Sequence, residues 1–241
     1  MGSGRVTRPD AAFYARTGTT GGDLMTLLHW PYTLWHLSYV VIGAAFAPEI
    51  DPVILAGTLL AFFFGLGVGA HALDELHDRP LGTGLRPEAL RALGWGGLAA
   101  AGGLAVAGAF VVSPWTLLWG FIGILLAATY TLEWVSWVHS DLGFALAWAA
   151  FPVLAGHWAQ AGSFGLPVMV AAAAATSLSM AQRHLSTPAR HVRRRAWGAS
   201  ATVGDEHWDR QRLLESWERP LRALAVAHVL LAVALILTHL V

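Results

Sequence analysis

Four titratable residues, His71, Asp74, Glu75 and Asp78, are spaced so that a single helix presents them together. They stand at positions i, i+3, i+4 and i+7, which share one face of an α-helix. Carboxylates suit Mg²⁺ that is also held by phosphate oxygens, whereas carboxylates mixed with imidazoles suit Zn, Fe or Mn. The four residues follow a long apolar stretch, so potential metal ligands gather where the chain leaves an apolar environment.

The composition of the chain identifies that environment as a membrane. The 241 residues are 56% hydrophobic and 12% charged, with a mean hydropathy of +0.54. The apolar residues form blocks of about 20, the length that crosses a bilayer as a helix. Backbone in lipid must satisfy its own hydrogen bonds, and the blocks lack the alternation of barrel strands. We therefore predict an all-α membrane bundle of about seven transmembrane helices, at 27–47, 52–73, 91–113, 115–133, 141–160, 164–184 and 220–240.

The basic residues predict the orientation of this bundle. All 15 are arginines, and they lie before the first run, between the second and third runs, and at the end of the sixth run and beyond it as far as Arg222. By the positive-inside rule, the N-terminus is cytoplasmic and the C-terminus is outside. We expect an integral protein of a bacterial or archaeal cytoplasmic membrane. It has a cytoplasmic segment, 1–26, and one transmembrane domain, 27–241, with a cytoplasmic loop at 185–219.

The region 196–222 allows two interpretations. It is either a solvated loop or a helix that lies along the membrane surface through an apolar stripe of Trp208, Leu213, Leu214 and Trp217.

Further titratable groups lie near the cytoplasmic ends of the predicted helices. His29 and His36 are seven residues apart in the first run, and His184 closes the sixth. Ionisable groups at membrane depth are costly, and such residues are functional hypotheses by default. We predict that Asp74 and Asp78 meet His71 and His184 around a cavity that opens to the cytoplasm.

The same segments resemble the UbiA superfamily of intramembrane prenyltransferases. The family's first motif is N-D-x-x-D-x-x-x-D followed by R-P-L-x-S-G; here Asp74 and Asp78 match its last two aspartates, and "RPLGTG" at 79–84 matches the tail. The first helix, "HWPYTLWHLSYVVIGAAFA", and the segment "YTLEWVSWVHSDLGFALAWAAFPVLAGHWAQAG", which begins at Tyr130, are similar to the family's first helix and to its fourth loop and fifth helix. The resemblance covers about 25–195.

Both motifs depart from the family pattern. His71 replaces an aspartate of the first motif. The second motif, R-D-x-x-x-D, is represented by "RHLSTPAR", in which Arg183 is kept, His184 takes the place of the first aspartate and Pro188 that of the second. The family also has nine helices as a rule, so the last helices of that fold are reduced here.

The resemblance implies a prenyltransferase-type enzyme that acts on an isoprenoid diphosphate or a similar lipid. In the family, two acidic motifs hold Mg²⁺ on the diphosphate, and an allylic carbocation alkylates an acceptor. By this resemblance Asp74 and Asp78 carry Mg²⁺, and the ring of Tyr130 faces the cation. Three arginines would replace the lost metal charge on phosphate oxygens, namely Arg79, Arg183 and Arg190.

Two other functions stay open at this point. One is a transition-metal enzyme, with Fe, Zn or Mn, that oxidises or hydrolyses a lipophilic substrate; its ligands would be His71, Asp74, Glu75, Asp78 and His184, with His29 and His36 as additional ligands. The other is a noncatalytic membrane protein that binds a lipid or a partner. We expect a lipophilic small molecule and membrane lipid as partners and no nucleic acid, with a homo-oligomer left open. A retinal protein is excluded, because without lysine no Schiff base forms.

Overall fold

The computed structural model describes residues 12–16 and 18–239. Over these residues the regular secondary structure is helical apart from one short hairpin, as the apolar blocks predict. In chain order the elements are α1 (Thr20–Leu27), α2 (Trp30–Ala45), α3 (Pro52–Phe62), η1 (Phe63–Ala70), α4 (His71–Asp78), α5 (Pro87–Val111), α6 (Thr116–Thr131), η2 (Ser136–His139), α7 (Asp141–Ala145), η3 (Leu146–Ala150), α8 (Phe151–Ala161), α9 (Leu166–Arg195), β1 (Ala201–Val203), β2 (Glu206–Trp208) and α10 (Arg210–Leu237).

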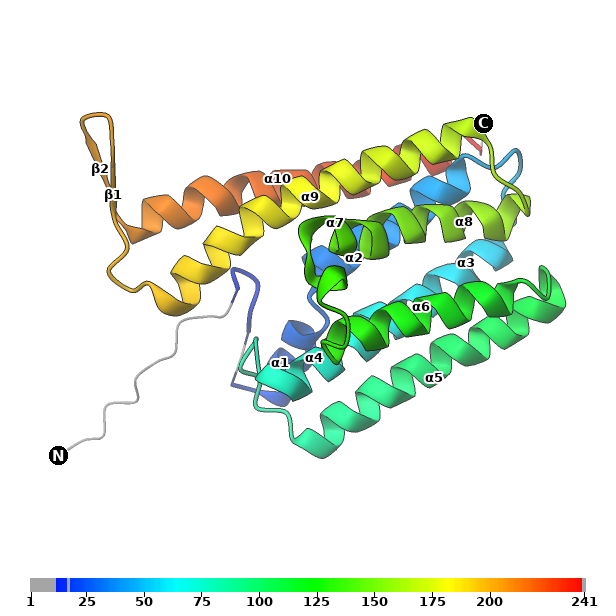
Figure 1. The fold of residues 1–241 in the computed structure, drawn as a ribbon, viewed down its shortest axis with the longest axis horizontal. Coiled ribbons are helices and arrows are strands. Elements are labelled where there is room, and N and C mark those ends of the chain that lie inside the picture. The colour runs from blue at the N-terminus through cyan, green and yellow to red at the C-terminus, as the bar shows by residue number, and fades with distance from the viewer. Residues whose placement is uncertain (1–11, 17, 240–241) are drawn as a thin grey trace.

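The helices form long rods that lie side by side in a bundle (Figure 1). Two rods are composite, since α3, η1 and α4 are continuous, as are α7, η3 and α8. In each composite rod a stretch of π-helix, η1 or η3, interrupts the α-helix, a feature that is frequent at functional sites. Four helices are long and apolar enough to cross a membrane, namely Pro52–Asp78, Pro87–Val111, Asp141–Ala161 and Arg210–Leu237.

Glycine allows two of these rods to touch through their backbones. A Cβ atom on Gly43 of α2 would overlap the carbonyl oxygen of Val153, and one on Gly156 of α8 would overlap that of Val40. Small residues at helix interfaces permit this approach in membrane proteins. The contact between α2 and α8 places the core cluster of Trp35, Tyr39 and Val153 at the centre of the bundle.

The arginines of the described residues gather at one end of the bundle, which we call the arginine-rich end. It contains α4, the C-terminal end of α6, the start of α7, the C-terminal end of α9 and the start of α10 (Figure 1). The segment 12–16 and α1 lie at the same end, beside α4. The structure therefore brings the cluster at 71–78 and the arginines of α9 to one side of the molecule.

The predicted loop at 185–219 is largely helical, which corrects the sequence interpretation. α9 continues to Arg195 through Pro188, and α10 begins at Arg210, well before the apolar run. Between them the chain forms the antiparallel hairpin β1–β2. Leu214 of α10 is buried against Val192 of α9. Leu214 and Trp217 of the predicted stripe thus pack against α9, whereas Trp208 lies on strand β2, so the stripe does not form a separate surface helix. The proposed cytoplasmic segment 1–26 lies partly outside the described residues.

Candidate functional site

A polar cavity of about 160 Å³ lies at the arginine-rich end. Its wall is built from the segment before α1, from α2, η1 and α4, and from α6, α7, η3, α9 and α10. Seven residues singled out from the sequence line it, namely His29, His36, His71, Asp74, Tyr130, Arg183 and Arg190. Segments far apart in the sequence thus bring most of the predicted groups to one polar cavity, as the cytoplasmic clustering predicts.

Arginines outnumber carboxylates in the wall of the polar cavity. Four arginines of α9 face it, Arg183, Arg190, Arg193 and Arg194, whereas its acidic residues are Asp74 and Glu218. The Glu218 carboxylate is held by Arg193 and, at 3.5 Å, by Arg222. Within the described residues, Asp74 is therefore the cavity carboxylate that forms no ion pair with the arginines of α9 and α10.

Two of the arginines are largely free to bind a ligand. The Nε atom of Arg194 is buried and has no hydrogen-bond partner within the described residues. Over the same part of the chain, the guanidinium of Arg190 makes one long hydrogen bond, of 3.4 Å, to Thr187 Oγ1. A buried, unpaired guanidinium is expensive, and an anion such as a phosphate relieves that cost through charge-assisted hydrogen bonds. The polar cavity is thus suited to an anionic group.

Two of the cavity histidines donate hydrogen bonds to backbone carbonyl groups. His36 Nδ1 lies 2.7 Å from the Trp148 carbonyl oxygen, and His71 Nδ1 lies 3.1 Å from that of Gly67. Because a carbonyl oxygen only accepts hydrogen bonds, each Nδ1 carries a proton, and in the neutral ring the lone pair is then on Nε2. Hydrogen bonding thus fixes the tautomer of both rings.

His29 joins this group in a strained backbone conformation. Its φ of 47° is left-handed, a conformation that concentrates at functional sites. The imidazole stacks on His71 with ring centroids 4.3 Å apart. Tyr14 Oη lies 2.8 Å from His29 Nδ1, and burial raises the pKa of the Tyr14 phenol, so this hydroxyl stays protonated and donates to the ring. Tyr14 could not be singled out from the sequence, because it lies in a polar segment outside the apolar runs.

Glu75, a predicted metal ligand, is a buried anchor for the loop after α4. Its carboxylate accepts hydrogen bonds from Leu81 N at 2.8 Å, Thr83 N at 2.7 Å and Thr83 Oγ1 at 2.8 Å. Arg79 also serves this loop, since its Nη1 atom donates to the Leu85 carbonyl oxygen at 2.7 Å. Both residues lie outside the wall of the polar cavity.

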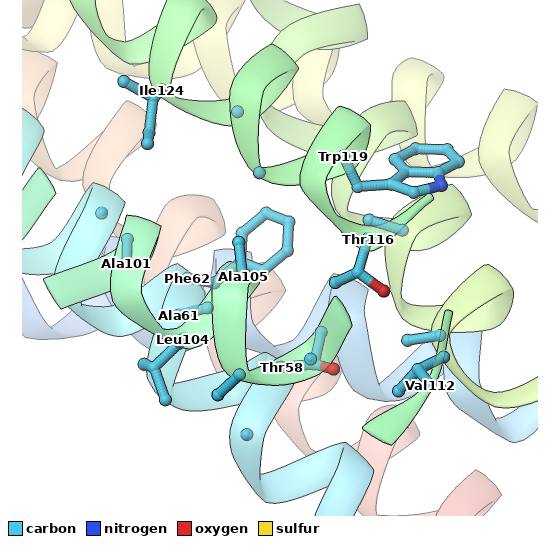
Figure 2. A pocket seen from close by; sticks show the side chains of 18 of the residues that line it. Thr58, Ala61, Phe62, Ala101, Leu104, Ala105, Val112, Thr116, Trp119 and Ile124 are labelled. Atoms are coloured by element: carbon cyan, nitrogen blue, oxygen red, sulfur yellow. The ribbon is translucent and has the colours of Figure 1, made fainter. Parts of the chain in front are cut away.

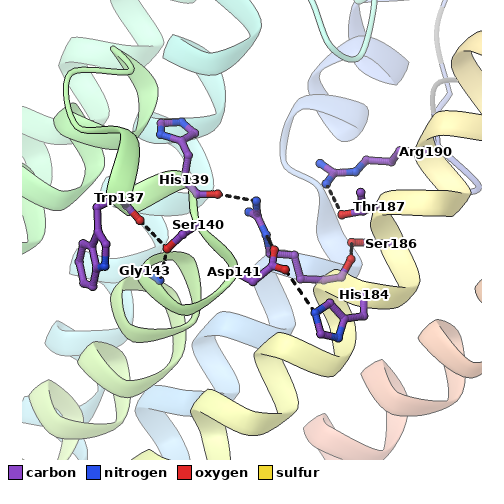
Figure 3. Close-up of polar contacts among 10 residues, drawn as sticks. Trp137, His139, Ser140, Asp141, Gly143, His184, Ser186, Thr187 and Arg190 are labelled. Carbon is purple, nitrogen blue, oxygen red and sulfur yellow. Dashed lines mark hydrogen bonds and ion pairs between the residues drawn. The ribbon is translucent and has the colours of Figure 1, made fainter.

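Asp78 and His184 also lie away from the cavity wall. Asp78 is exposed at the last turn of α4. His184 is exposed and bonds through Nε2 to Asp141 Oδ2 at 3.2 Å, and Figure 3 shows this pair between α7 and α9. The structure therefore brings Asp74 and His71 together but places Asp78 and His184 elsewhere.

Arg183 ties α9 to the start of α7. Its Nε atom donates to Asp141 Oδ1 at 2.5 Å, and its Nη2 atom donates to the His139 carbonyl oxygen at 2.7 Å. The guanidinium also lies 4.8 Å from the centre of the Phe144 ring. Arg183 is thus engaged within the protein, whereas Arg190 and Arg194 are available for a ligand.

The predicted metal ligands are separated by these contacts. Within 12–16 and 18–239, no group of three or more His, Cys, Asp or Glu side chains is arranged to hold a metal ion. Mg²⁺ needs fewer, since it commonly binds one or two carboxylates together with substrate phosphates and water. Asp74, which faces the uncommitted arginines, fits that mode of binding.

A second, apolar pocket of about 270 Å³ adjoins the polar cavity. It lies among α3, η1, α5, α6 and α8, and Figure 2 shows it lined mainly by apolar side chains such as Leu104 and Trp119. Leu66 of η1 and Trp148 of η3 line both spaces. The two π-helical stretches thus contribute residues to the partition between the polar cavity and the apolar pocket.

Comparisons with protein-family models, with curated proteins and with solved structures find no match for this chain. Its four long apolar helices are those of a helical membrane protein. Function is therefore inferred from the residues and the geometry of the two cavities.

Proposed function

We propose that this chain is a UbiA-like, prenyltransferase-type membrane enzyme that acts on an isoprenoid diphosphate or a similar anionic lipid. One observation carries the proposal: a polar cavity with two uncommitted arginines, Arg190 and Arg194, shares a wall with an apolar pocket. The negative charge of a diphosphate head group complements the arginines of the polar cavity. The hydrocarbon chain of the same molecule fits the apolar pocket beside it.

In this proposal the bundle crosses the membrane with all seven rods. The rods coincide with the seven apolar runs, and the arginines gather at one end, which we assign to the cytoplasm. The N-terminus is then cytoplasmic and the C-terminus is outside. The polar cavity faces the compartment that supplies soluble diphosphates.

The head group is bound by charge from two sides. Arg190 and Arg194 donate to phosphate oxygens, and Asp74 is the residue that would hold Mg²⁺ beside them. When bound, Mg²⁺ neutralises charge on the departing diphosphate. Because the second acidic motif is lost and His184 lies outside the cavity, arginine supplies the larger share of positive charge here.

The reaction transfers the allylic group to an acceptor. The bond between the allylic carbon and the diphosphate oxygen breaks, and its electron pair leaves with the diphosphate. An electron pair of the acceptor forms the new bond, and the acceptor loses one proton. Tyr130 offers its ring to the positive allylic carbon, and the Nε2 lone pair of His71 is placed to accept the proton.

Binding of an isoprenoid diphosphate tests the proposal. The full chain in detergent micelles is titrated with geranylgeranyl diphosphate and Mg²⁺, and Kd is compared with those of Arg190→Gln and Arg194→Gln. Loss of a charge-assisted hydrogen bond predicts a Kd increase of about 10- to 100-fold for each variant. Arg195→Gln is the matched control, because Arg195 is exposed and lies outside the cavity wall.

Three results would contradict the proposal. The wild-type protein does not bind the diphosphate, Arg195→Gln weakens binding as much as Arg194→Gln, or the purified protein contains stoichiometric Fe, Zn or Mn. The last result would favour the transition-metal enzyme in place of prenyl transfer.

A further inference from the structure

The loop that joins α6 to α7, residues 132–140, carries three large apolar side chains that the protein leaves uncovered. Trp134, Val135 and Trp137 are 66%, 42% and 54% exposed, whereas Val138 of the same loop is buried. Contiguous exposed apolar residues mark a surface that contacts something other than water. We call this segment the tryptophan loop.

The tryptophan loop is held in one conformation by its own contacts. The Trp134 backbone N–H donates to the Thr129 carbonyl oxygen at 3.2 Å. Ser140 Oγ donates to the Trp137 carbonyl oxygen at 2.6 Å, and a Cβ atom on Gly143 of α7 would overlap that same oxygen. Figure 3 shows these contacts, with the Trp137 indole pointing away from them. The exposed side chains are therefore fixed on the outside of an ordered loop.

The length of α6 places this loop at a membrane surface. The helix has 16 residues, which at a rise of about 1.5 Å per residue span about 24 Å. The hydrocarbon core of a bilayer is about 30 Å thick, so a helix this short does not carry the following loop into bulk water. Irregular backbone exposed to lipid is excluded from the hydrocarbon itself. The interface between hydrocarbon and water is the position that remains.

Tryptophan brackets α6 at both ends. Trp115, which is 67% exposed, directly precedes the helix, and Trp134 closely follows it. Tryptophan is enriched at both membrane interfaces, because its ring is apolar while its N–H group stays near water. Leu142 and Leu146 are exposed in the span Asp141–Ala161 that comes next along the chain. They continue the apolar surface of the loop into the lipid-facing surface of the bundle.

We propose that the tryptophan loop anchors the protein in the membrane interface, with Trp134, Val135 and Trp137 among the glycerol and upper acyl groups of the phospholipids. Glu133 and Ser136, which are exposed in the same loop, remain with the head groups and water. The inference takes from the proposed function that α6 crosses the membrane. It is otherwise independent of prenyl transfer.

The anchored loop also supports the wall of the polar cavity. Tyr130, at the end of α6, stacks on His139 of the loop with ring centroids 4.5 Å apart. The Arg183 guanidinium donates to the His139 carbonyl oxygen at 2.7 Å. Tyr130 and Arg183 both line the polar cavity. Contact with lipid thus holds the loop on which two residues of the cavity wall rest.

Site-directed spin labelling tests the inference, since the chain has no cysteine and one introduced cysteine gives one labelled site. The full chain carrying Val135→Cys is labelled and reconstituted into vesicles of phosphatidylcholine and phosphatidylglycerol. Electron paramagnetic resonance then compares collisions of the label with oxygen, which concentrates in lipid, and with a water-soluble nickel complex. Val203→Cys is the matched control, and Phe121→Cys, near the middle of α6 and 63% exposed, gives the value for the bilayer interior.

Val203 is a suitable control because it is also an exposed valine at the arginine-rich end. It is 49% exposed on β1, in the hairpin that follows α9 and projects from the bundle (Figure 1). α9 has 30 residues and spans about 45 Å, which is enough to carry the hairpin beyond the bilayer. We expect the ratio of oxygen to nickel collisions to be highest at Phe121, intermediate at Val135 and lowest at Val203.

Replacing the tryptophans shows whether they hold the loop in the interface. With the label at Val135, Trp134→Ser combined with Trp137→Ser should shift the collision ratio toward the value at Val203. Trp197→Ser is the control, because Trp197 is 58% exposed at the same end but follows α9. It should leave the ratio at Val135 unchanged. If the double variant does not fold, the label at Val135 beside the native tryptophans decides alone.

Four outcomes would overturn the anchor. A label at Val135 as accessible to nickel as one at Val203 would place the loop in water, and a label shielded from both reagents would show that protein, such as a second copy of the chain, covers it. An unchanged ratio in the folded double serine variant would show that the tryptophans do not hold the loop. A label at Phe121 open to nickel would show that α6 does not cross the membrane, which removes the topology of the proposed function as well.

The diphosphate titration distinguishes the anchor from the proposed enzyme. An interfacial label at Val135 in a protein that binds no isoprenoid diphosphate would retain the anchor and remove the prenyltransferase. Diphosphate binding, with Phe121 in lipid and Val135 in water, would retain the proposed function and overturn the anchor.

Discussion

Replacement of Glu75 tests whether this residue is a loop anchor or a metal ligand. The side chain is fully buried, and its carboxylate accepts three hydrogen bonds from Leu81 and Thr83. Each hydrogen bond to a charged group contributes about 1.5–3 kcal/mol to stability. Because neighbouring bonds are not additive, we expect Glu75→Ala to lower the free energy of unfolding by about 4 kcal/mol, near the lower limit of the sum.

Glu75→Gln should have an intermediate effect. The remaining amide oxygen can still accept from Thr83, whereas the amide nitrogen faces Leu81 N–H and leaves that donor unpaired. One buried, unsatisfied donor costs about 1–3 kcal/mol. Glu88→Ala is the control, because Glu88 is a surface residue whose ion pair with Arg91, at 3.8 Å, is largely exposed. Its stability should match that of the wild type.

Chemical unfolding in detergent micelles, followed by circular dichroism with and without EDTA, measures these differences. A loop anchor predicts the order Glu75→Ala, Glu75→Gln, Glu88→Ala from least to most stable, with no dependence on chelation. If Glu75→Ala is as stable as Glu88→Ala, the hydrogen bonds do not support the loop. If EDTA destabilises the wild type and has no effect on Glu75→Ala, the residue is a metal ligand.

Two further predictions concern packing between helices. Glu218→Ala leaves the Arg193 side chain, which is 17% exposed, without its ion pair and should lower the free energy of unfolding by about 3 kcal/mol. Glu206→Ala removes an exposed ion pair and should change that free energy little. Equal unfolding midpoints for the two variants would refute the role of the pair between Arg193 and Glu218. Gly156→Leu should prevent α2 and α8 from packing together, because even the Cβ atom would overlap the Val40 backbone, whereas Gly103→Leu should not disturb the fold. Size-exclusion chromatography after purification measures the difference between the two variants. A monodisperse Gly156→Leu protein would contradict the predicted overlap.

Local sequence signals were sufficient for the helical architecture. Lipid provides no partners for backbone polar groups, so blocks of about 20 apolar residues predict helices regardless of their neighbours. The apolar runs do fall in helices, and four of these are long and apolar enough to span a membrane. Hydropathy failed at 185–219, where charge replaces apolarity. There α9 reaches Arg195 through contacts that the sequence does not display, such as the pairing of Arg193 with Glu218.

The composition of the polar cavity was only partly predictable. Helical spacing places His71 and Asp74 on one face, and both line the cavity. The same spacing includes Glu75 and Asp78, yet the first turns to the loop after α4 and the second is exposed. Periodicity assigns a residue to a face of its helix, but it cannot show which neighbouring group satisfies that residue.

By itself, the sequence determined that the chain is apolar and helical and that its arginines lie in a few connections, because hydropathy and charge can be read for each segment separately. Only the tertiary structure decided which arginines are free, since Arg183 is taken by Asp141 while Arg194 is left unpaired within the described residues. It also decided that Leu66 and Trp148 divide a polar space from an apolar one. Those outcomes depend on contacts between residues far apart in the chain, which no local pattern encodes.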